Sequence, residues 1–171
     1  MDISIRPFTT TDIKPIVAAF QQANWPKPIA IFETYYQEQI NHARMVWVAY
    51  CDDVIAGYVT LKWQSLYKPF YEQSIPEIID LNVLPDFRLQ GIGTRLLEKA
   101  EQLAKTKSST VGLGVGLYGG PDGGYGSAQR LYIKHGYIPD GRGVTYNYKP
   151  VQPGASCPVD DDLILWFCKQ L

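Results

Sequence analysis

The segment that most constrains this chain is PDFRLQGIGT, residues 85–94, which stands between an apolar run and a helix-like stretch. The run before it, residues 78–84, is typical of a strand, and residues 94–105 carry apolar side chains at helical spacing. Two glycines and an arginine therefore lie where a strand ends and a helix begins. Because another strand-like segment follows the helix, we expect a right-handed crossover between two parallel strands.

The same periodicities divide the rest of the chain into alternating elements. A capping box of Thr9 and Asp12 predicts a helix that buries Ile13, Ile16 and Phe20. Further helices are predicted over residues 32–40, 94–105 and 127–136. Strands are predicted over residues 3–8, 44–50, 55–63, 77–84, 110–118, 143–149 and 163–171, and irregular loops over 64–76, 119–126 and 150–162.

Short turns join most of the other strands, which we therefore expect to be antiparallel. A parallel crossover combined with antiparallel strands gives a mixed sheet with helices on both faces, an α/β or α+β fold. A length of 171 residues favours a single domain that spans residues 1–171.

Composition excludes several classes of partner. The net charge of −1 offers no overall field for nucleic acid or an anionic membrane, and no apolar run approaches the ~20 residues that span a bilayer. Cys51, Cys157 and Cys168 are widely spaced and predict neither a disulfide framework nor a metal site. We expect a cytoplasmic protein with reduced thiols and leave a homodimer open.

The glycine turn itself predicts an anion site. A helix N-terminus exposes unpaired N–H groups, and glycines let a ligand approach the backbone closely. A phosphate group fits this description. The dinucleotide fingerprint does not match, because Leu96 stands where it needs Gly or Ala, and no Gly-Lys-Ser/Thr sequence marks a nucleotide P-loop.

Two motifs carry a resemblance to a known family. Arg-x-x-Gly-x-Gly at residues 88–93 directly follows the strand LNVLP, and Ala-x-x-Leu-Tyr-x-x-x-Gly-Tyr occupies residues 128–137. These segments resemble motifs A and B of the GNAT superfamily of N-acetyltransferases, in this order, and the likeness covers nearly the whole chain. It implies an enzyme that moves an acetyl group from acetyl-CoA to an amine.

The resemblance also implies which residues hold acetyl-CoA. Backbone groups of the turn cradle the pyrophosphate, and Arg88 adds charge. The preceding strand offers backbone groups to the pantetheine arm where the two parallel strands splay apart. Ser127 is expected to help, because Tyr125 stands where the family often has an Asn. The cofactor-binding residues expected from this likeness are Leu81, Asn82, Val83, Arg88, Leu89, Gln90, Gly91, Ile92, Gly93, Thr94 and Ser127.

The chemistry needs an acid and a base. The resemblance assigns Tyr132 as the acid that protonates the departing thiolate. Some relatives carry a Glu base on the strand after the motif A helix, but here that strand reads VGLGVGLY. The base candidates are therefore Glu77 and Asp80, with Glu72 in the aromatic loop as a third. Regular strand alternation would place Glu77 and Asp80 on opposite faces, and we favour Glu77.

The acceptor is expected to be a primary amine of a small cationic molecule, since aromatic rings and carboxylates together suit a cation. The rings and acids expected near it are Tyr35, Tyr36, Trp63, Tyr67, Phe70, Tyr71, Glu72 and the acidic run 160–162. Two alternatives stay open: acetylation of a protein or peptide amine, and a CoA-binding sensor or interaction module without catalysis.

Overall fold

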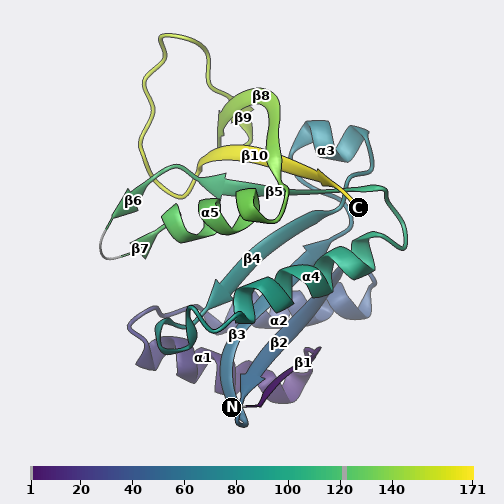
Figure 1. Cartoon of the computed structure of the whole chain (residues 1–171), viewed down its shortest axis with the longest axis vertical. Helices are drawn as coiled ribbons and strands as arrows, with labels where there is room; N and C mark the ends of the chain where they lie inside the picture. The colour runs from purple at the N-terminus through teal and green to yellow at the C-terminus, as the bar shows by residue number, and fades with distance from the viewer. Residues whose placement is uncertain (1, 121–122) are drawn as a thin grey trace. The chain divides into compact units, whose positions relative to one another are not determined.

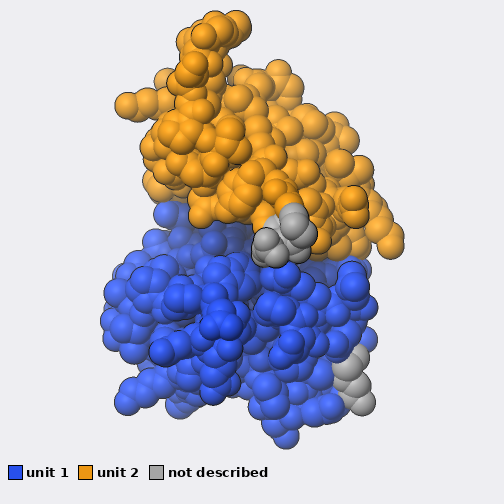
Figure 2. Space-filling model, turned by 90° about the vertical axis from the view of Figure 1, so that its left-hand side faces the viewer, with its two compact units in different colours: residues 1–63, 78–103 blue, residues 64–77, 104–171 orange. Residues whose placement is uncertain are grey.

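The computed structural model describes residues 2–120 and 123–171, which fall into two units. The first unit contains Met1–Trp63 and Ile78–Leu103, and the second contains Gln64–Glu77 and Ala104–Leu171 (Figure 2). The single domain expected over residues 1–171 stays a prediction.

The first unit's part of the main sheet has the strand order β1 (Ile3–Pro7), β2 (Arg44–Cys51), β3 (Val54–Lys62) and β4 (Glu77–Val83), with Glu77 itself in the second unit. Strand β2 pairs antiparallel with both β1 and β3. Asp52 and Asp53 link β2 to β3 with φ of 46° and 66°, the left-handed pair of a type I′ hairpin turn. The predicted hairpin is confirmed.

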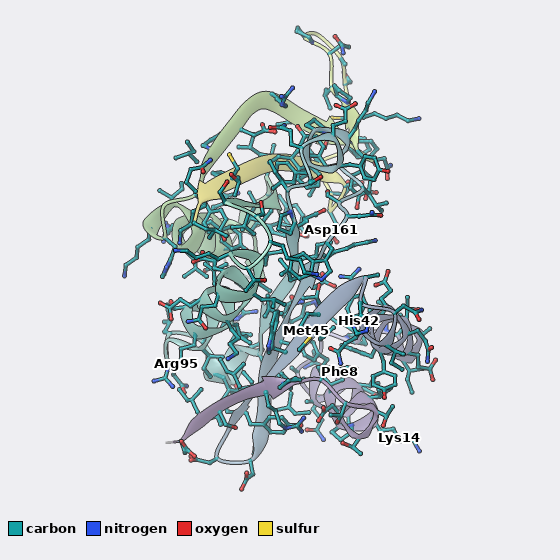
Figure 3. All side chains as sticks on the ribbon, turned by 90° about the vertical axis from the view of Figure 1, so that its right-hand side faces the viewer. Phe8, Lys14, His42, Met45, Arg95 and Asp161 are labelled. Atoms are coloured by element: carbon teal, nitrogen blue, oxygen red, sulfur yellow. The ribbon has the colours of Figure 1, made fainter. Side chains whose placement is uncertain are left out.

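Helices cover both faces of this sheet. Figure 1 shows α4 (Ile92–Ala104) across one face of β2 to β4, and α1 (Ile13–Gln22) and α2 (Ile29–Ile40) behind the other. Phe8, labelled in Figure 3, packs its ring against Phe32 and Tyr36 of α2. The expected mixed α/β class with helices on both faces is confirmed.

The predicted capping box of Thr9 and Asp12 is present and begins a short 3-10 turn, Thr10–Asp12, ahead of α1. Asp12 is 1% exposed and accepts hydrogen bonds from Arg6 Nη2 at 2.6 Å and Tyr50 Oη at 2.5 Å. The backbone N–H of Thr9 also donates to Asp12 Oδ2, at 2.8 Å. Burial alone would raise the pKa of Asp12, but the donors outweigh it and lower that pKa to about 2.

We expect Asp12→Asn to lower the free energy of unfolding at pH 7 by about 1 to 2 kcal/mol. Solvent weakens the Arg6–Asp12 ion pair, because the Arg6 side chain is 44% exposed, so the loss is smaller than the full effect of the pKa shift. The lowered pKa of Asp12 stabilises the fold fully at pH values above about 4, the pKa of an aspartate in the unfolded chain. This stabilisation is lost as the pH falls toward 2, the pKa of Asp12 in the folded protein. Urea unfolding of wild type and Asp12→Asn at pH 7 and pH 3 measures the difference in their free energies of unfolding. This difference should be smaller at pH 3.

Asp53→Asn, in the exposed hairpin turn, is the matched control and should leave stability near wild type. A gap between wild type and Asp12→Asn of equal size at both pH values would contradict the role given to the Asp12 carboxylate.

The second unit's part of the sheet has the strand order β5 (Thr110–Gly116), β10 (Leu163–Gln170), β8 (Ile138–Tyr146) and β9 (Lys149–Pro150), and these neighbours pair antiparallel. Helix α5 (Gly126–Lys134) matches its prediction and ends before Gly136, whose φ is +86°. The splay expected between β4 and the strand at 110–118 stays a prediction.

Three details of the second unit differ from expectation. The aromatic loop contains a short helix, α3 (Lys68–Glu72), and β8 begins at Ile138 rather than residue 143. The glycine loop contains two short paired strands, β6 (Gly119–Gly120) and β7 (Gly123–Gly124), while its residues 121–122 lie outside the described residues. Within the described ranges, no helix has the length and apolar character needed to cross a membrane.

The glycines of β5 make room for aromatic rings. A Cβ at Gly112 would lie 2.1 Å from the Phe70 ring, and one at Gly116 would lie 2.3 Å from the Tyr125 ring. Phe70 in turn packs with Tyr67 and Trp166 in one buried cluster. These glycines lower the β-strand propensity of β5, but they allow the aromatic rings to pack closely against its backbone.

Candidate active site

The turn that follows β4 has the backbone of an anion cradle. A 3-10 turn, Pro85–Phe87, follows the strand, and α4 begins at Ile92. Leu89 and Gly91 both take positive φ, 61° and 80°, and no atom lies within 4 Å of a Cβ built on Gly91. A helix directs its first N–H groups outward along its axis, so the start of α4 presents backbone donors beside this open space.

Arg88 is anchored at this turn without being buried. Its Nε donates to the carbonyl oxygen of Val83 at 3.1 Å, and its guanidinium lies 5.9 Å from the centre of the Trp25 ring. The side chain is exposed. A positive charge therefore stands at the end of β4, close to the start of α4.

Two buried polar side chains lie side by side, Asn82 on β4 and Tyr58 on β3. Asn82 is close enough to hydrogen-bond the Tyr58 phenol. Burial is the main reason why the pKa of Tyr58 is raised well above its usual value, and the charge of Asp80 adds to it, while the contact with Asn82 lowers this pKa and offsets part of the rise. The phenol therefore stays protonated.

Asp80 lies in the middle of β4 with a left-handed backbone, φ 54°. The expectation that Glu77 and Asp80 face opposite sides rests on regular alternation, and this residue interrupts it. The hydroxyl of Tyr35, on α2, donates to Asp80 Oδ2. Burial, followed by the Asp80 charge, raises the pKa of Tyr35, so this phenol is a proton donor and not a base.

A chain of polar contacts fixes the backbone next to Asp80. Arg44 lies with its guanidinium 4.3 Å from the centre of the Tyr35 ring, and its Nη1 donates to Thr60 Oγ1 at 2.6 Å. Thr60 Oγ1 donates in turn to the carbonyl oxygen of Ile79 at 3.1 Å. Glu38 neutralises the arginine, with Oε2 at 2.5 Å from Arg44 Nε. These contacts tie the carbonyl of Ile79, the residue before Asp80, to Thr60 and Arg44.

The second unit carries the remaining predicted side chains. Glu77 is 5% exposed and accepts a hydrogen bond from Ser65 Oγ at 2.5 Å. Tyr132, on α5, is 7% exposed and packs edge-on against Tyr137, with ring centres 5.8 Å apart. Ser127 is exposed in the first turn of the same helix.

The predicted residues thus fall into two groups. The first unit contains Asp80, Leu81, Asn82, Val83, Arg88, Leu89, Gln90, Gly91, Ile92, Gly93 and Thr94, and the second contains Glu77, Ser127 and Tyr132. Tyr67 and Phe70, expected beside the acceptor, are buried in the cluster around Trp166. Tyr71 is exposed, and Tyr35 and Tyr36 are partly buried against the first unit's core.

Sequence reasoning missed the hydroxyl partners of the two carboxylates. Tyr35 was expected as a ring near the acceptor, not as a donor to Asp80, and Ser65 was not expected to act at all. The partners lie 45 and 12 positions apart in the chain, so no local pattern in the sequence gave a signal for either hydrogen bond.

Comparison with known proteins identifies the family. A model of the acetyltransferase (GNAT) family matches residues 12–137. The chain belongs to this family. GNAT enzymes use acetyl-CoA, so the protein is an acetyl-CoA-dependent N-acetyltransferase. The open turn at Gly91 and the adjacent helix start fit the anionic part of such a cofactor.

Three solved structures illustrate the shared fold. An N-acetyltransferase from Staphylococcus aureus Mu50 is 20% identical, with a TM-score of 0.69 and 99% of each chain covered. The ribosomal-protein-S18-alanine N-acetyltransferase from Escherichia coli is 18% identical, with a TM-score of 0.68, covering 99% of this chain and 94% of the other.

The third structure is yncA from Salmonella typhimurium, a putative acetyltransferase with its cofactor acetyl-CoA. It is 16% identical, with a TM-score of 0.69, covering 98% of this chain and 93% of the other. A comparison with curated protein sequences gives no match. These identities support the common fold and leave the acceptor to be argued from the site.

Proposed function

We propose that this enzyme acetylates a primary amine of a small cationic molecule by direct attack on acetyl-CoA. The observation that carries the choice of acceptor is the Asp80 carboxylate, which lies among the rings of Tyr35 and Tyr58 in the first unit. A carboxylate beside aromatic rings favours an ammonium group over a neutral or anionic acceptor. A cytoplasmic location and a homodimer stay predictions.

The residues of the turn are assigned to the cofactor. The backbone N–H groups from Leu89 to Thr94 bind the pyrophosphate, and Arg88 adds a positive charge. Backbone groups of Leu81, Asn82 and Val83 bind the pantetheine arm, and Ser127 adds a hydroxyl. When bound, acetyl-CoA supplies the thioester that the amine attacks.

Side chains of the protein move two protons, one away from the acceptor ammonium and one to the departing thiolate. An alkyl ammonium has a pKa of about 10.4, so only about one molecule in a few thousand is neutral at pH 7. Glu77, through a water, takes a proton from the ammonium, and Asp80 holds the cation in place. The nitrogen forms its bond to the carbonyl carbon as the C–S bond breaks, and Tyr132 gives its hydroxyl proton to the departing thiolate. The nitrogen then loses its second proton, by way of solvent, to the Tyr132 oxygen, which leaves a neutral amide and restores the phenol.

The test is CoA release from acetyl-CoA measured against a panel of alkyl amines, amino acids and peptides with free N-termini. Faster release with small cationic amines supports the proposal. Release with peptides alone would replace the small molecule by a protein or peptide acceptor. Tight acetyl-CoA binding without release in any mixture would make the chain a CoA-binding sensor.

We expect Gly91→Val to raise the Kd for acetyl-CoA at least about tenfold. Valine is strained at φ +80° and places its side chain in the open space where the pyrophosphate is assigned. Isothermal calorimetry measures this Kd.

Gly154 is the matched control, because its φ is +84° and no atom lies within 4 Å of its Cβ position either. Gly154→Val carries the same backbone strain but should bind acetyl-CoA like wild type. Wild-type affinity in Gly91→Val would place the pyrophosphate site elsewhere.

A further inference from the structure

The linker between α1 and α2 places a lysine over three aromatic rings. Lys27 Nζ lies 5.0 Å from the ring centre of Trp25, 5.7 Å from that of Phe20 and 6.0 Å from that of Tyr58. We call these three rings the cage. All three distances fall in the range of cation–π attraction. Phe20 and Tyr58 are fully buried, so the Lys27 ammonium covers ring faces that belong to the core.

The backbone around the cage is stiff. Trp25 donates its N–H to the carbonyl oxygen of Phe20 at 2.9 Å, which folds the linker back onto the end of α1. Pro26 and Pro28 flank Lys27 and hold this stretch extended. The ammonium can therefore leave the cage by rotation of its own side chain, without movement of the linker.

The rings alone hold this ammonium. Among residues 2–120 and 123–171, no carboxylate lies within ion-pair distance of Lys27 Nζ. Another ammonium could therefore take its place at little cost, because the exchange keeps the cation–π attraction and breaks no ion pair.

Two of the cage rings also lie close to groups assigned to the cofactor and to the acceptor cation. Trp25 carries the Arg88 guanidinium, 5.9 Å from its ring centre, in addition to Lys27. The Tyr58 phenol lies close enough to Asp80 and Asn82 for both to act on its pKa. The cage therefore lies between the cofactor turn and the middle of β4, all within the first unit.

We propose that the cage of Phe20, Trp25 and Tyr58 binds a second ammonium group of the acceptor, and that Lys27 is the cation it displaces. The acceptor class is then an alkyl diamine, with one ammonium in the cage and the other amine at the thioester. This inference rests on the proposed function and narrows it. Lys27 sets specificity, since it competes with the acceptor for the same rings.

The experiment compares 1,4-diaminobutane with butylamine as acceptors for wild type, Lys27→Ala and Trp25→Leu. Lys27→Ala should lower the KM for the diamine about 5- to 30-fold, because it removes a competitor held by cation–π attraction. The KM for butylamine should change little. Trp25→Leu removes one wall of the cage and should abolish the preference for the diamine.

Lys14→Ala is the control, because Lys14 is an exposed lysine on α1 (Figure 3). Thermal unfolding and the Kd for acetyl-CoA show whether each variant keeps its fold and its cofactor site. An unchanged or higher KM for the diamine in a folded Lys27→Ala would overturn the cage assignment alone. Failure of wild type to acetylate either amine would overturn the proposed function as well.

Discussion

Replacement of Tyr132 by Phe is expected to lower kcat by about 10² to 10⁴ and to leave the Kd for acetyl-CoA near its wild-type value. The ring of Tyr132 is 7% exposed and packs against Tyr137, and Phe keeps this packing. The change removes only the hydroxyl proton that we assign to the leaving thiolate. Single-turnover kinetics with saturating acetyl-CoA measure the chemical step directly.

Tyr137→Phe is the matched control, because it removes a hydroxyl from the neighbouring ring of the same pair. It should turn over like wild type. A leaving group with a lower thiol pKa should rescue Tyr132→Phe in part, since it needs its proton less. An unchanged kcat in Tyr132→Phe would show that Tyr132 is not the acid and only packs against its neighbours.

The parts of the fold that the sequence predicted are those governed by local rules. The Thr9–Asp12 capping box, the Asp52–Asp53 hairpin turn and the glycine after α5 each depend on a few neighbouring residues. The turn at 88–93 belongs with them, because its glycines and the start of α4 are adjacent in sequence. The helical and strand periodicities of the apolar residues then predicted the sheet and the helices that cover it.

The contacts around the two carboxylates could not be predicted in the same way. Tyr35 and Asp80 lie 45 positions apart in the chain, and Ser65 and Glu77 lie 12 apart. No periodicity connects such pairs, which meet only when α2 packs on its sheet and the aromatic segment folds. The left-handed backbone of Asp80 is equally a product of tertiary structure, since strand propensity alone favours an extended residue.

The two candidate acids, Glu77 and Asp80, differ in how far they are buried. Glu77 is 5% exposed, while Asp80 is partly exposed. Ser65 donates a hydroxyl hydrogen bond to Glu77, and Tyr35 donates one to Asp80. A partly exposed carboxylate among rings suits the binding of a cation, and a buried one, reached through a water, suits proton transfer. This difference is the basis for assigning the base to Glu77.

We therefore expect Glu77→Gln to lower kcat/KM by about 10² to 10⁴ at neutral pH and to flatten its pH dependence. In wild type the rate should rise with pH as the base loses its proton and then level off. Glutamine keeps an oxygen that can accept the Ser65 hydrogen bond, so the fold should survive. The measurement is kcat/KM across pH for wild type and variant, with an amine of fixed structure.

Three variants decide between this assignment and its alternatives. Glu72→Gln, on the exposed surface of α3, should behave like wild type. Ser65→Ala removes a hydrogen bond that stabilises the carboxylate, so the rate should level off at a higher pH. Asp80→Asn should raise the KM for the amine and keep the pH profile, because its assigned role is to hold the cation. If Asp80→Asn is instead inactive while Glu77→Gln is fully active, the base is Asp80.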